Sequence, residues 1–148
     1  MQLISKSVTD TLNIGKRIAK RLEKGDIVCL FGEFGAGKTV LTKGIALGLG
    51  VAKDKITSPS FVLIREYPKA RLPLYHFDLY RLTKEKDILA IGYQDYLYDD
   101  GVAVIEWADR LNELLPKEYL KVSLCISGEL MREITITPVG KRYERLIK

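Results

Sequence analysis

The stretch that decides the fold of this chain is Gly32-Glu33-Phe34-Gly35-Ala36-Gly37-Lys38-Thr39. It matches the pattern G-x-x-x-x-G-K-T, a phosphate-binding loop in which backbone N–H groups surround phosphate oxygens. In such a loop we expect Lys38 to reach the β- and γ-phosphates and the Thr39 hydroxyl to ligate Mg²⁺. The stretch therefore predicts a nucleotide ligand and the strand, loop and helix that present the loop.

The residues on both sides of the loop fit that prediction. Residues 26–31 are mostly apolar and follow Gly25, which predicts a short buried strand before the loop. Residues 38–49 predict a helix after it, and Gly50 stands in the C-terminal cap position. Because the loop leads into the start of a helix, the partial positive charge of the helix N-terminus should add to the anion site.

The composition is that of an ordinary globular protein, with 47% hydrophobic and 29% charged residues among 148. We expect one domain, residues 1–148. No run approaches 18 apolar residues and residues 1–10 lack a signal-peptide pattern, so we expect a cytoplasmic protein without membrane contact. Cys29 and Cys125 both fall in predicted strands, and we expect buried free thiols. The net charge of +5 permits an RNA partner or an acidic protein partner without requiring either.

Apolar periodicity predicts the other elements. Ser7 and Asp10 resemble a capping box before a helix over residues 8–24, whose basic outer face is either solvated or a docking surface for an acidic partner. Strands are predicted over residues 61–67, 72–82 and 102–105, helices over 84–98 and 108–115, and a hairpin over 119–127 and 132–138. This order predicts a three-layer α/β fold of the P-loop NTPase type, with central parallel strands, antiparallel strands at the margins and helices on both faces.

Two acidic residues could complete the chemistry of the loop. Phosphoryl transfer needs a metal that neutralises developing charge and a group that orients the nucleophile. Glu106 ends the most apolar predicted strand, and Asp78 lies among apolar and aromatic residues that would make an unpaired carboxylate costly to bury. We expect a metal or water role for each, and the alternative is a salt bridge, such as one between Asp78 and Arg81.

Three further features bear on the site. The segment 57–60 (Thr-Ser-Pro-Ser) follows the loop helix and is either a γ-phosphate-sensitive switch or a plain connection. His76 is the single histidine, and we expect it to be hydrogen-bonded and structural rather than a general base. Trp107 and the tyrosines are expected to pack rather than to stack on bases. The chain lacks an N-K-x-D guanine motif, which favours ATP over GTP.

Four blocks together resemble one family. They are the loop, Thr57-Ser-Pro-Ser-Phe61, His76-Phe-Asp-Leu-Tyr-Arg81 and Ile105-Glu106-Trp107, in the order and approximate spacing of the TsaE (YjeE) family. The resemblance covers nearly the whole chain. It implies a small ATPase that binds ATP or ADP with Mg²⁺ and is required for threonylcarbamoyladenosine modification of tRNA. It also implies weak activity alone and two partner proteins, TsaD and TsaB, through which tRNA is reached; direct tRNA contact stays open.

The resemblance also implies individual residue roles. Thr39 and Glu106 match the metal ligands, and Lys38, Asp78 and Glu106 match the catalytic positions. The implied nucleotide-binding residues are Thr11, Phe34, Gly35, Ala36, Gly37, Lys38, Thr39, Val40 and Arg132. Two positions depart from the family pattern, since Val40 and Ser60 stand where many members have threonine. Neither departure removes an essential group, because Thr39 keeps the metal hydroxyl and Ser60 keeps a hydroxyl.

Two other functional hypotheses stay open at this point. A small-molecule kinase would use the same loop, although no arginine-rich lid is evident and little chain is left for an acceptor pocket. A nucleotide-dependent binding module would use the loop without depending on hydrolysis.

Overall fold

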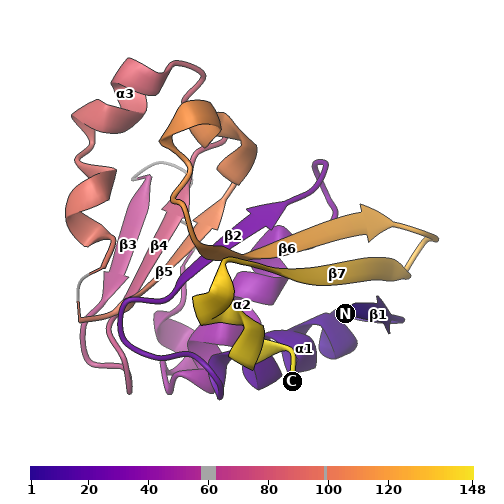
Figure 1. The fold of residues 1–148 in the computed structure, drawn as a ribbon. Coiled ribbons are helices and arrows are strands. Elements are labelled where there is room, and N and C mark those ends of the chain that lie inside the picture. Colours follow the sequence, from indigo (N-terminus) through magenta and orange to yellow (C-terminus); the bar gives the residue numbers. More distant parts are fainter. Residues whose placement is uncertain (58–62, 99) are drawn as a thin grey trace.

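The computed structural model describes residues 1–57, 63–98 and 100–148. Within these ranges the chain forms one seven-stranded sheet in the order β1-β7-β6-β2-β5-β4-β3 (Figure 1). The strands are β1 (Gln2–Ser5), β2 (Ile27–Phe31), β3 (Ile64–Tyr67), β4 (Leu74–Asp78), β5 (Val102–Glu106), β6 (Tyr119–Ile126) and β7 (Arg132–Val139).

The sheet has a parallel centre and antiparallel margins. β6, β2, β5 and β4 run parallel to one another. β7 pairs antiparallel with β6 and with β1 at one margin, and β3 pairs antiparallel with β4 at the other. The structure therefore confirms the predicted α/β arrangement. It also brings the carboxyl ends of β2, β4 and β5 to one edge, where ligands bind in open α/β sheets.

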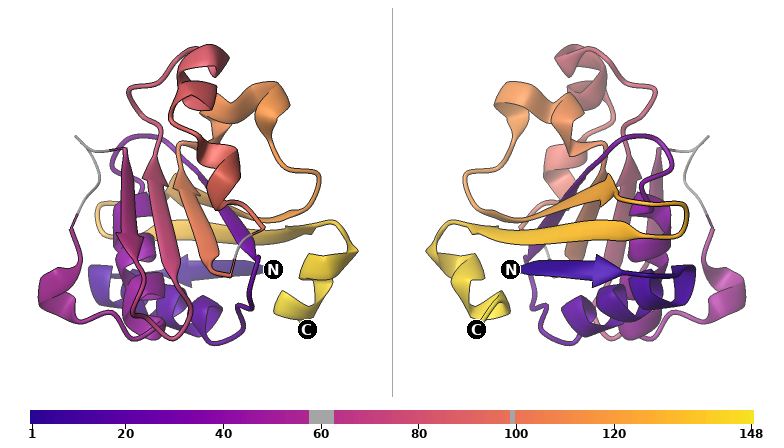
Figure 2. Two further views of the ribbon diagram at one scale, coloured as in Figure 1. Left: turned by 90° about the vertical axis from the view of Figure 1, so that its left-hand side faces the viewer. Right: turned by 90° about the vertical axis from the view of Figure 1, so that its right-hand side faces the viewer.

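Helices cover both faces of the sheet (Figure 2). α1 (Val8–Ala19) and α2 (Lys38–Gly48) pack on one face, and α3 (Glu85–Ala90) packs on the other with two 3₁₀ segments, η2 (Tyr93–Tyr96) and η3 (Ala108–Leu114). Successive residues of β2 point into different cores: Val28 and Leu30 join the α1/α2 side, and Ile27 and Cys29 the other side. Burial on both faces explains why β2 and β5 read as continuous apolar runs.

α1 and α2 pack very closely, and glycine makes this approach possible. A Cβ added to Gly44 would lie 2.3 Å from the carbonyl oxygen of Leu12, and one added to Gly15 would lie 2.5 Å from that of Leu41. No side chain fits at either position. This contact fixes where α2 begins, and so where the loop before it lies.

The start of α1 is as predicted, but its end is not. The Ser7 hydroxyl accepts from Asp10 N at 3.0 Å, which confirms Ser7 as the N-cap. The Asp10 carboxylate accepts from Lys6 N at 2.9 Å, one residue before the amide that a standard capping box uses. The helix predicted to residue 24 ends at Ala19. Beyond it, the amide of Leu22 bonds three residues back, to Ala19 O at 3.2 Å, in the tighter geometry that often ends a helix.

The elements between β3 and β6 are shorter than predicted. The helix predicted over 84–98 splits into α3 and η2 because Gly92 adopts a left-handed φ of 70°. The strand predicted over 72–82 is only Leu74–Asp78, since the Asp78 carboxylate accepts from Tyr80 N at 3.1 Å and turns the chain. The segment 108–115 is 3₁₀ rather than α, with a kink at Asn112. Of the strand predicted over 61–67, residues 61 and 62 lie outside the described residues.

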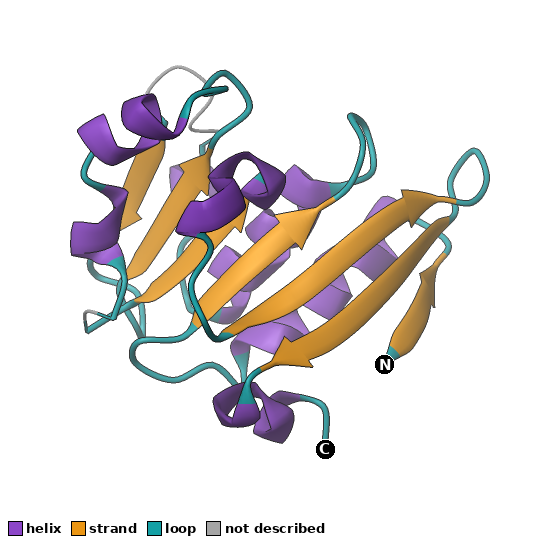
Figure 3. Cartoon of the chain, turned by 45° about the horizontal axis from the view of Figure 1, so that its top comes forward, coloured by secondary structure: helices purple, strands orange, loops and turns teal. Residues whose placement is uncertain are grey.

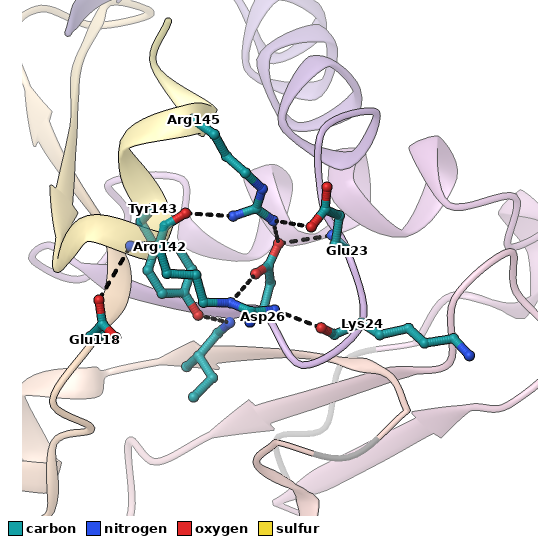
Figure 4. A network of polar contacts seen from close by, with 8 residues as sticks. Glu23, Lys24, Asp26, Glu118, Arg142, Tyr143 and Arg145 are labelled. Carbon is teal, nitrogen blue, oxygen red and sulfur yellow. Dashed lines mark hydrogen bonds and ion pairs between the residues drawn. The ribbon is translucent and has the colours of Figure 1, made fainter.

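Three elements were not predicted: the edge strand β1, the short 3₁₀ segment η1 (Lys53–Lys55) and the C-terminal 3₁₀ segment η4 (Lys141–Leu146). Side chains of η4 bind the amino end of β2 (Figure 4). Asp26 is fully buried there; its carboxylate accepts from Arg142 Nε at 3.0 Å and also pairs with Arg145. The Tyr143 hydroxyl accepts from Ile27 N at 2.7 Å. η4 thus holds the start of the strand whose other end carries the phosphate loop.

The prediction of buried thiols is half right. Cys29 is buried in β2, whereas Cys125 is exposed. Cys125 lies near the end of β6, which Figure 3 shows beside β7 as one of the two long strands of the sheet. Among the described residues, no helix is long and apolar enough to span a bilayer.

Candidate nucleotide-binding site

The phosphate loop connects the end of β2 to the start of α2. Gly35 and Gly37 have φ values of 80° and 102°, which side chains rarely adopt. A Cβ on Gly32 would lie 2.6 Å from Leu124 O, so the backbone can pass β6 only as glycine. Gly37 is also the N-cap of α2 and has no side chain to satisfy the first amides of the helix. These amides are therefore available to an anion.

A pocket of about 450 Å³ lies at this edge of the sheet, in the size range of small-ligand sites. It is lined by Phe34, Gly35, Gly37, Lys38, Thr39, Val40, Asp78, Tyr80, Arg81, Glu106 and Trp107. The pocket thus brings together residues of the loop, the end of β4 and the end of β5. These segments are far apart in the sequence and become neighbours only in the sheet.

Glu106 meets the loop helix at the base of this pocket. It is 2% exposed, and its Oε1 accepts a hydrogen bond of 2.8 Å from the Thr39 hydroxyl. Its Oε2 is in contact with Nε2 of His76, which is also buried. The parallel register pairs Glu106 with Leu30 of β2 and Asp78 of β4, so the sheet places all three at the same level. The expectation of a hydrogen-bonded His76 is confirmed.

Lys38 points back over its own loop. Its ammonium donates to the carbonyl oxygens of Gly32 and of Glu33, the latter at 3.0 Å, and lies 4.0 Å from the centre of the Trp107 ring. Burial lowers the pKa of Lys38, and the nearby Glu106 carboxylate opposes that shift. These contacts are ones that an arriving phosphate can replace, because a charged ligand interacts with an ammonium more strongly than a carbonyl does.

Asp78 lies in the pocket beside Glu106. Burial raises the pKa of Asp78, the hydrogen bond from Tyr80 N lowers it, and the negative charge of Glu106 raises it further. Two neighbouring acids in one pocket, one at the loop helix and one facing the cavity, suit different tasks. The alternative of a salt bridge from Asp78 to Arg81 stays open, since both residues line the pocket.

The donor set at the base of the pocket fits Mg²⁺. The described residues contain no group of three or more His, Cys, Asp or Glu side chains that could hold a metal. Mg²⁺ in nucleotide sites does not need such a group, because it keeps waters and takes one or two protein oxygens together with phosphates. The adjacent Thr39 hydroxyl and Glu106 carboxylate supply hard oxygen ligands of that kind.

Three of the predicted binding residues lie outside the pocket wall. Arg132 donates to Gly35 O at 3.2 Å, so its guanidinium contacts the loop from the hairpin. Thr11 is buried beneath the loop, and its hydroxyl is hydrogen-bonded to that of Ser5 at 2.7 Å. Ala36 is fully buried within the loop. Of the predicted switch segment only Thr57 is described, and it contacts the Tyr67 hydroxyl through its backbone; residues 58–60 lie outside the described residues.

The sequence analysis missed three pocket residues, Tyr80, Arg81 and Trp107. Tyr80 lies between Phe34 and Trp107 with ring centres 6.3 and 5.0 Å away and ring planes tilted by 46° and 47°, so three aromatic rings form a row along the pocket. Trp107 packs, as expected, but it does so in the wall of the pocket, against Tyr80 and Lys38. The place of the missed residues in the chain was the available signal. Tyr80 and Arg81 follow Asp78 at the end of β4, and Trp107 follows Glu106 at the end of β5.

Comparison with known proteins agrees with the four blocks of the sequence. The family model described as "Threonylcarbamoyl adenosine biosynthesis protein TsaE" matches residues 5–134. The chain is 44% identical to the tRNA threonylcarbamoyladenosine biosynthesis protein TsaE of Bacillus subtilis, over 93% of this chain and 85% of that protein. It is 43% identical to the TsaE of Treponema pallidum, over 92% of this chain and 99% of that protein.

A solved structure is also similar. The crystal structure of YdiB from Bacillus subtilis superposes with a TM-score of 0.84 at 39% identity, covering 99% of this chain and 90% of that chain. The match includes the loop, both acidic strand ends and the outer hairpin, because it extends over nearly the whole chain. This chain therefore belongs to the TsaE family of threonylcarbamoyl adenosine biosynthesis proteins.

Proposed function

We propose that this protein binds ATP with Mg²⁺ and hydrolyses it, and that hydrolysis supports threonylcarbamoyladenosine formation in tRNA by acting on a TsaD–TsaB complex. One observation carries the proposal. The Thr39 hydroxyl at the start of the loop helix and the Glu106 carboxylate at the end of a central strand lie 2.8 Å apart, at the base of a pocket that also holds Lys38 and Asp78.

In this proposal the loop and α2 bind the phosphates. The amides that open α2 and the ammonium of Lys38 form the anion site, and the lowered pKa of Lys38 reflects burial that a bound phosphate would compensate. Phe34, Gly35, Ala36, Gly37 and Val40 surround the same site. Thr11 supports the loop from below and Arg132 from the hairpin, through its bond to Gly35.

Thr39 and Glu106 would hold Mg²⁺. When bound, Mg²⁺ neutralises charge on the phosphate oxygens and helps to align them. Glu106 is held ready because the sheet register fixes its backbone and its two carboxylate oxygens have separate protein partners. To bind Mg²⁺, the Glu106 side chain would only have to give up its hydrogen bond with Thr39, after which both residues could ligate the ion.

We assign the attacking water to Asp78. Its carboxylate faces the pocket from β4, and its raised pKa brings it closer to the range in which a carboxylate accepts a proton effectively. Its backbone is held by the register with Glu106, so the two acids keep a constant separation. A group that orients a nucleophile must be positioned in this way.

The partners in the proposal come from family membership. TsaD and TsaB would be the proteins on which hydrolysis acts, tRNA would be reached through them, and the setting would be the cytoplasm. The three aromatic rings beside the pocket, of which Phe34 is 79% exposed, provide a surface near the nucleotide that a partner could cover.

The experiment is phosphate release from ATP, measured with the protein alone, with TsaD and TsaB, and with tRNA added. We expect slow Mg²⁺-dependent release that the partner proteins increase. Transfer of the phosphate to a small acceptor instead would favour a kinase. A non-catalytic binding module predicts that partner binding depends on the bound nucleotide, but is the same with ATP and with its non-hydrolysable analogue.

A further inference from the structure

His76 contacts Glu106 from inside the protein. It is 3% exposed, lies in the middle of β4, and is not among the described residues that line the pocket. Side chains alternate along a strand, so His76 and Asp78 of β4 share one sheet face, the face on which Glu106 meets α2. The Glu106 carboxylate thus has a pocket-side partner, Thr39, and an interior partner, His76.

This interior contact requires a hydrogen on Nε2. The oxygen that it faces belongs to a carboxylate, which when ionised only accepts hydrogen bonds. Without the donor, Oε2 of Glu106 would be a buried oxygen lacking a partner, and the terminal torsion of the glutamate would be free to turn, since such torsions have broad minima. His76 therefore determines which Glu106 oxygen is directed at Thr39.

We propose that His76 is a positioning residue that donates from Nε2 to Glu106 Oε2 and so directs Oε1 to the magnesium position. This inference rests on the proposed function, because it assumes that Mg²⁺ is held by Thr39 and Glu106. Hydrogen bonds to metal-binding carboxylates orient them, and their loss commonly lowers metal affinity by about 10–100-fold. His76 would set the affinity for Mg²⁺ without touching nucleotide or metal.

The test compares His76→Asn with His76→Gln. The amide nitrogen of glutamine reaches about as far along the side chain as Nε2 of histidine, whereas that of asparagine corresponds to Nδ1 and falls short of Glu106. The readout is the dissociation constant of the β,γ-imido analogue of ATP, measured by calorimetry with Mg²⁺ and again with EDTA. We expect His76→Asn to weaken the Mg²⁺-dependent gain in affinity by about tenfold or more. His76→Gln should keep most of that gain, and affinity in EDTA should match the wild type in both variants.

A control separates positioning from general destabilisation. Tyr93→Phe removes a partly buried hydrogen bond to Leu114 O on the opposite face of the sheet, so it should lower the melting temperature and leave the Mg²⁺-dependent gain unchanged. In a Glu106→Gln background, His76→Asn should cause no further loss, because the group that it positions is altered.

Three results would overturn the proposal. They are a wild-type Mg²⁺-dependent gain in His76→Asn, an equal loss of affinity with Mg²⁺ and with EDTA, or loss of the gain in a folded His76→Gln protein. If His76→Asn does not fold, the glutamine variant decides alone, with retained gain as support. A wild-type protein that binds no nucleotide would refute the proposed function itself, which the variant comparison does not do.

Discussion

Two buried carboxylates lie at opposite ends of the central strands, and their surroundings differ. Asp26, at the amino end of β2, is bound by the guanidinium groups of Arg142 and Arg145 and by the backbone amide of Glu23 at 2.8 Å (Figure 4). Glu106, at the carboxyl end of β5, is bound by the hydroxyl of Thr39 and the ring of His76.

In the proposed function, the difference separates a structural acid from a functional one. Two cations neutralise Asp26, and Asp26 is not among the residues that line the three pockets of the described part of the chain. Glu106 is at the base of a cavity and one of its partners is a hydroxyl that can itself ligate a metal. In the proposed function, a bound Mg²⁺ would add to the charge compensation that the nearby Lys38 ammonium gives Glu106.

The largest expected effect is on catalysis. Glu106→Gln and Lys38→Ala should each lower ATP hydrolysis by at least about 100-fold, the usual cost of removing one preorganised group that stabilises transition-state charge. Because neither residue belongs to the two hydrophobic clusters of the core, the melting temperature of each variant should stay close to that of the wild type. Phosphate release and thermal unfolding check the two statements. If Glu106→Gln hydrolysed ATP at the wild-type rate, Glu106 would not have the catalytic role that the comparison with Asp26 assigns to it.

The next effect is on stability. Asp26→Asn should lower the free energy of unfolding by about 3 kcal/mol, the lower end for breaking a buried ion pair, since both arginines are partly exposed. Loss of the two ion pairs should detach η4 from β2 and leave the affinity for nucleotide little changed. Urea unfolding and nucleotide titration measure these separately. If Asp26→Asn unfolded like the wild type but lost nucleotide binding, Asp26 would be tied to the nucleotide site rather than to the stability of the opposite end of the sheet.

The stability of the protein should depend on pH through Asp78. Burial raises the pKa of Asp78, so between its usual value near 4 and the raised value the folded state holds more protons than the unfolded state. Stability from this group is therefore lost as the pH rises through that window. Asp78→Asn should show a higher unfolding midpoint than the wild type at pH 7 and no gain at pH 3. If the variant and the wild type had equal midpoints at pH 7 as well as at pH 3, burial of the charged Asp78 carboxylate would not destabilise the folded state.

The smallest effect concerns the exposed part of the Asp26 cluster. Glu23 is 67% exposed and its carboxylate lies 3.3 Å from Arg145, whereas Asp26 is fully buried. Glu23→Gln should change the unfolding free energy by less than about 1 kcal/mol, as is typical of surface ion pairs. Urea unfolding beside Asp26→Asn gives the contrast directly. A loss as large as that of the Asp26 variant would mean that the whole cluster acts as one unit.

The central elements were predictable because their signals are local. Each of these signals depends only on neighbouring residues. They are the apolar runs that became β2 and β5, the N-cap at Ser7, the glycine loop and the cap at Gly50. Errors arose where a tertiary contact or a single backbone angle decided. The left-handed Gly92 split one helix, and β1 has only four residues, whose pairing partners lie over a hundred positions away in β7.

The sequence by itself determined that a phosphate loop lies between a buried strand and a helix, and it marked Glu106 at a strand end and Asp78 within a predicted strand as candidate acids; the structure then ended that strand at Asp78. Only the tertiary structure decided that Glu106 meets Thr39, that Trp107 and Tyr80 line the same pocket, and that His76 contacts Glu106 from inside. The physical reason is that a motif is read along the chain, whereas sheet register and strand order bring together residues separated by dozens of positions.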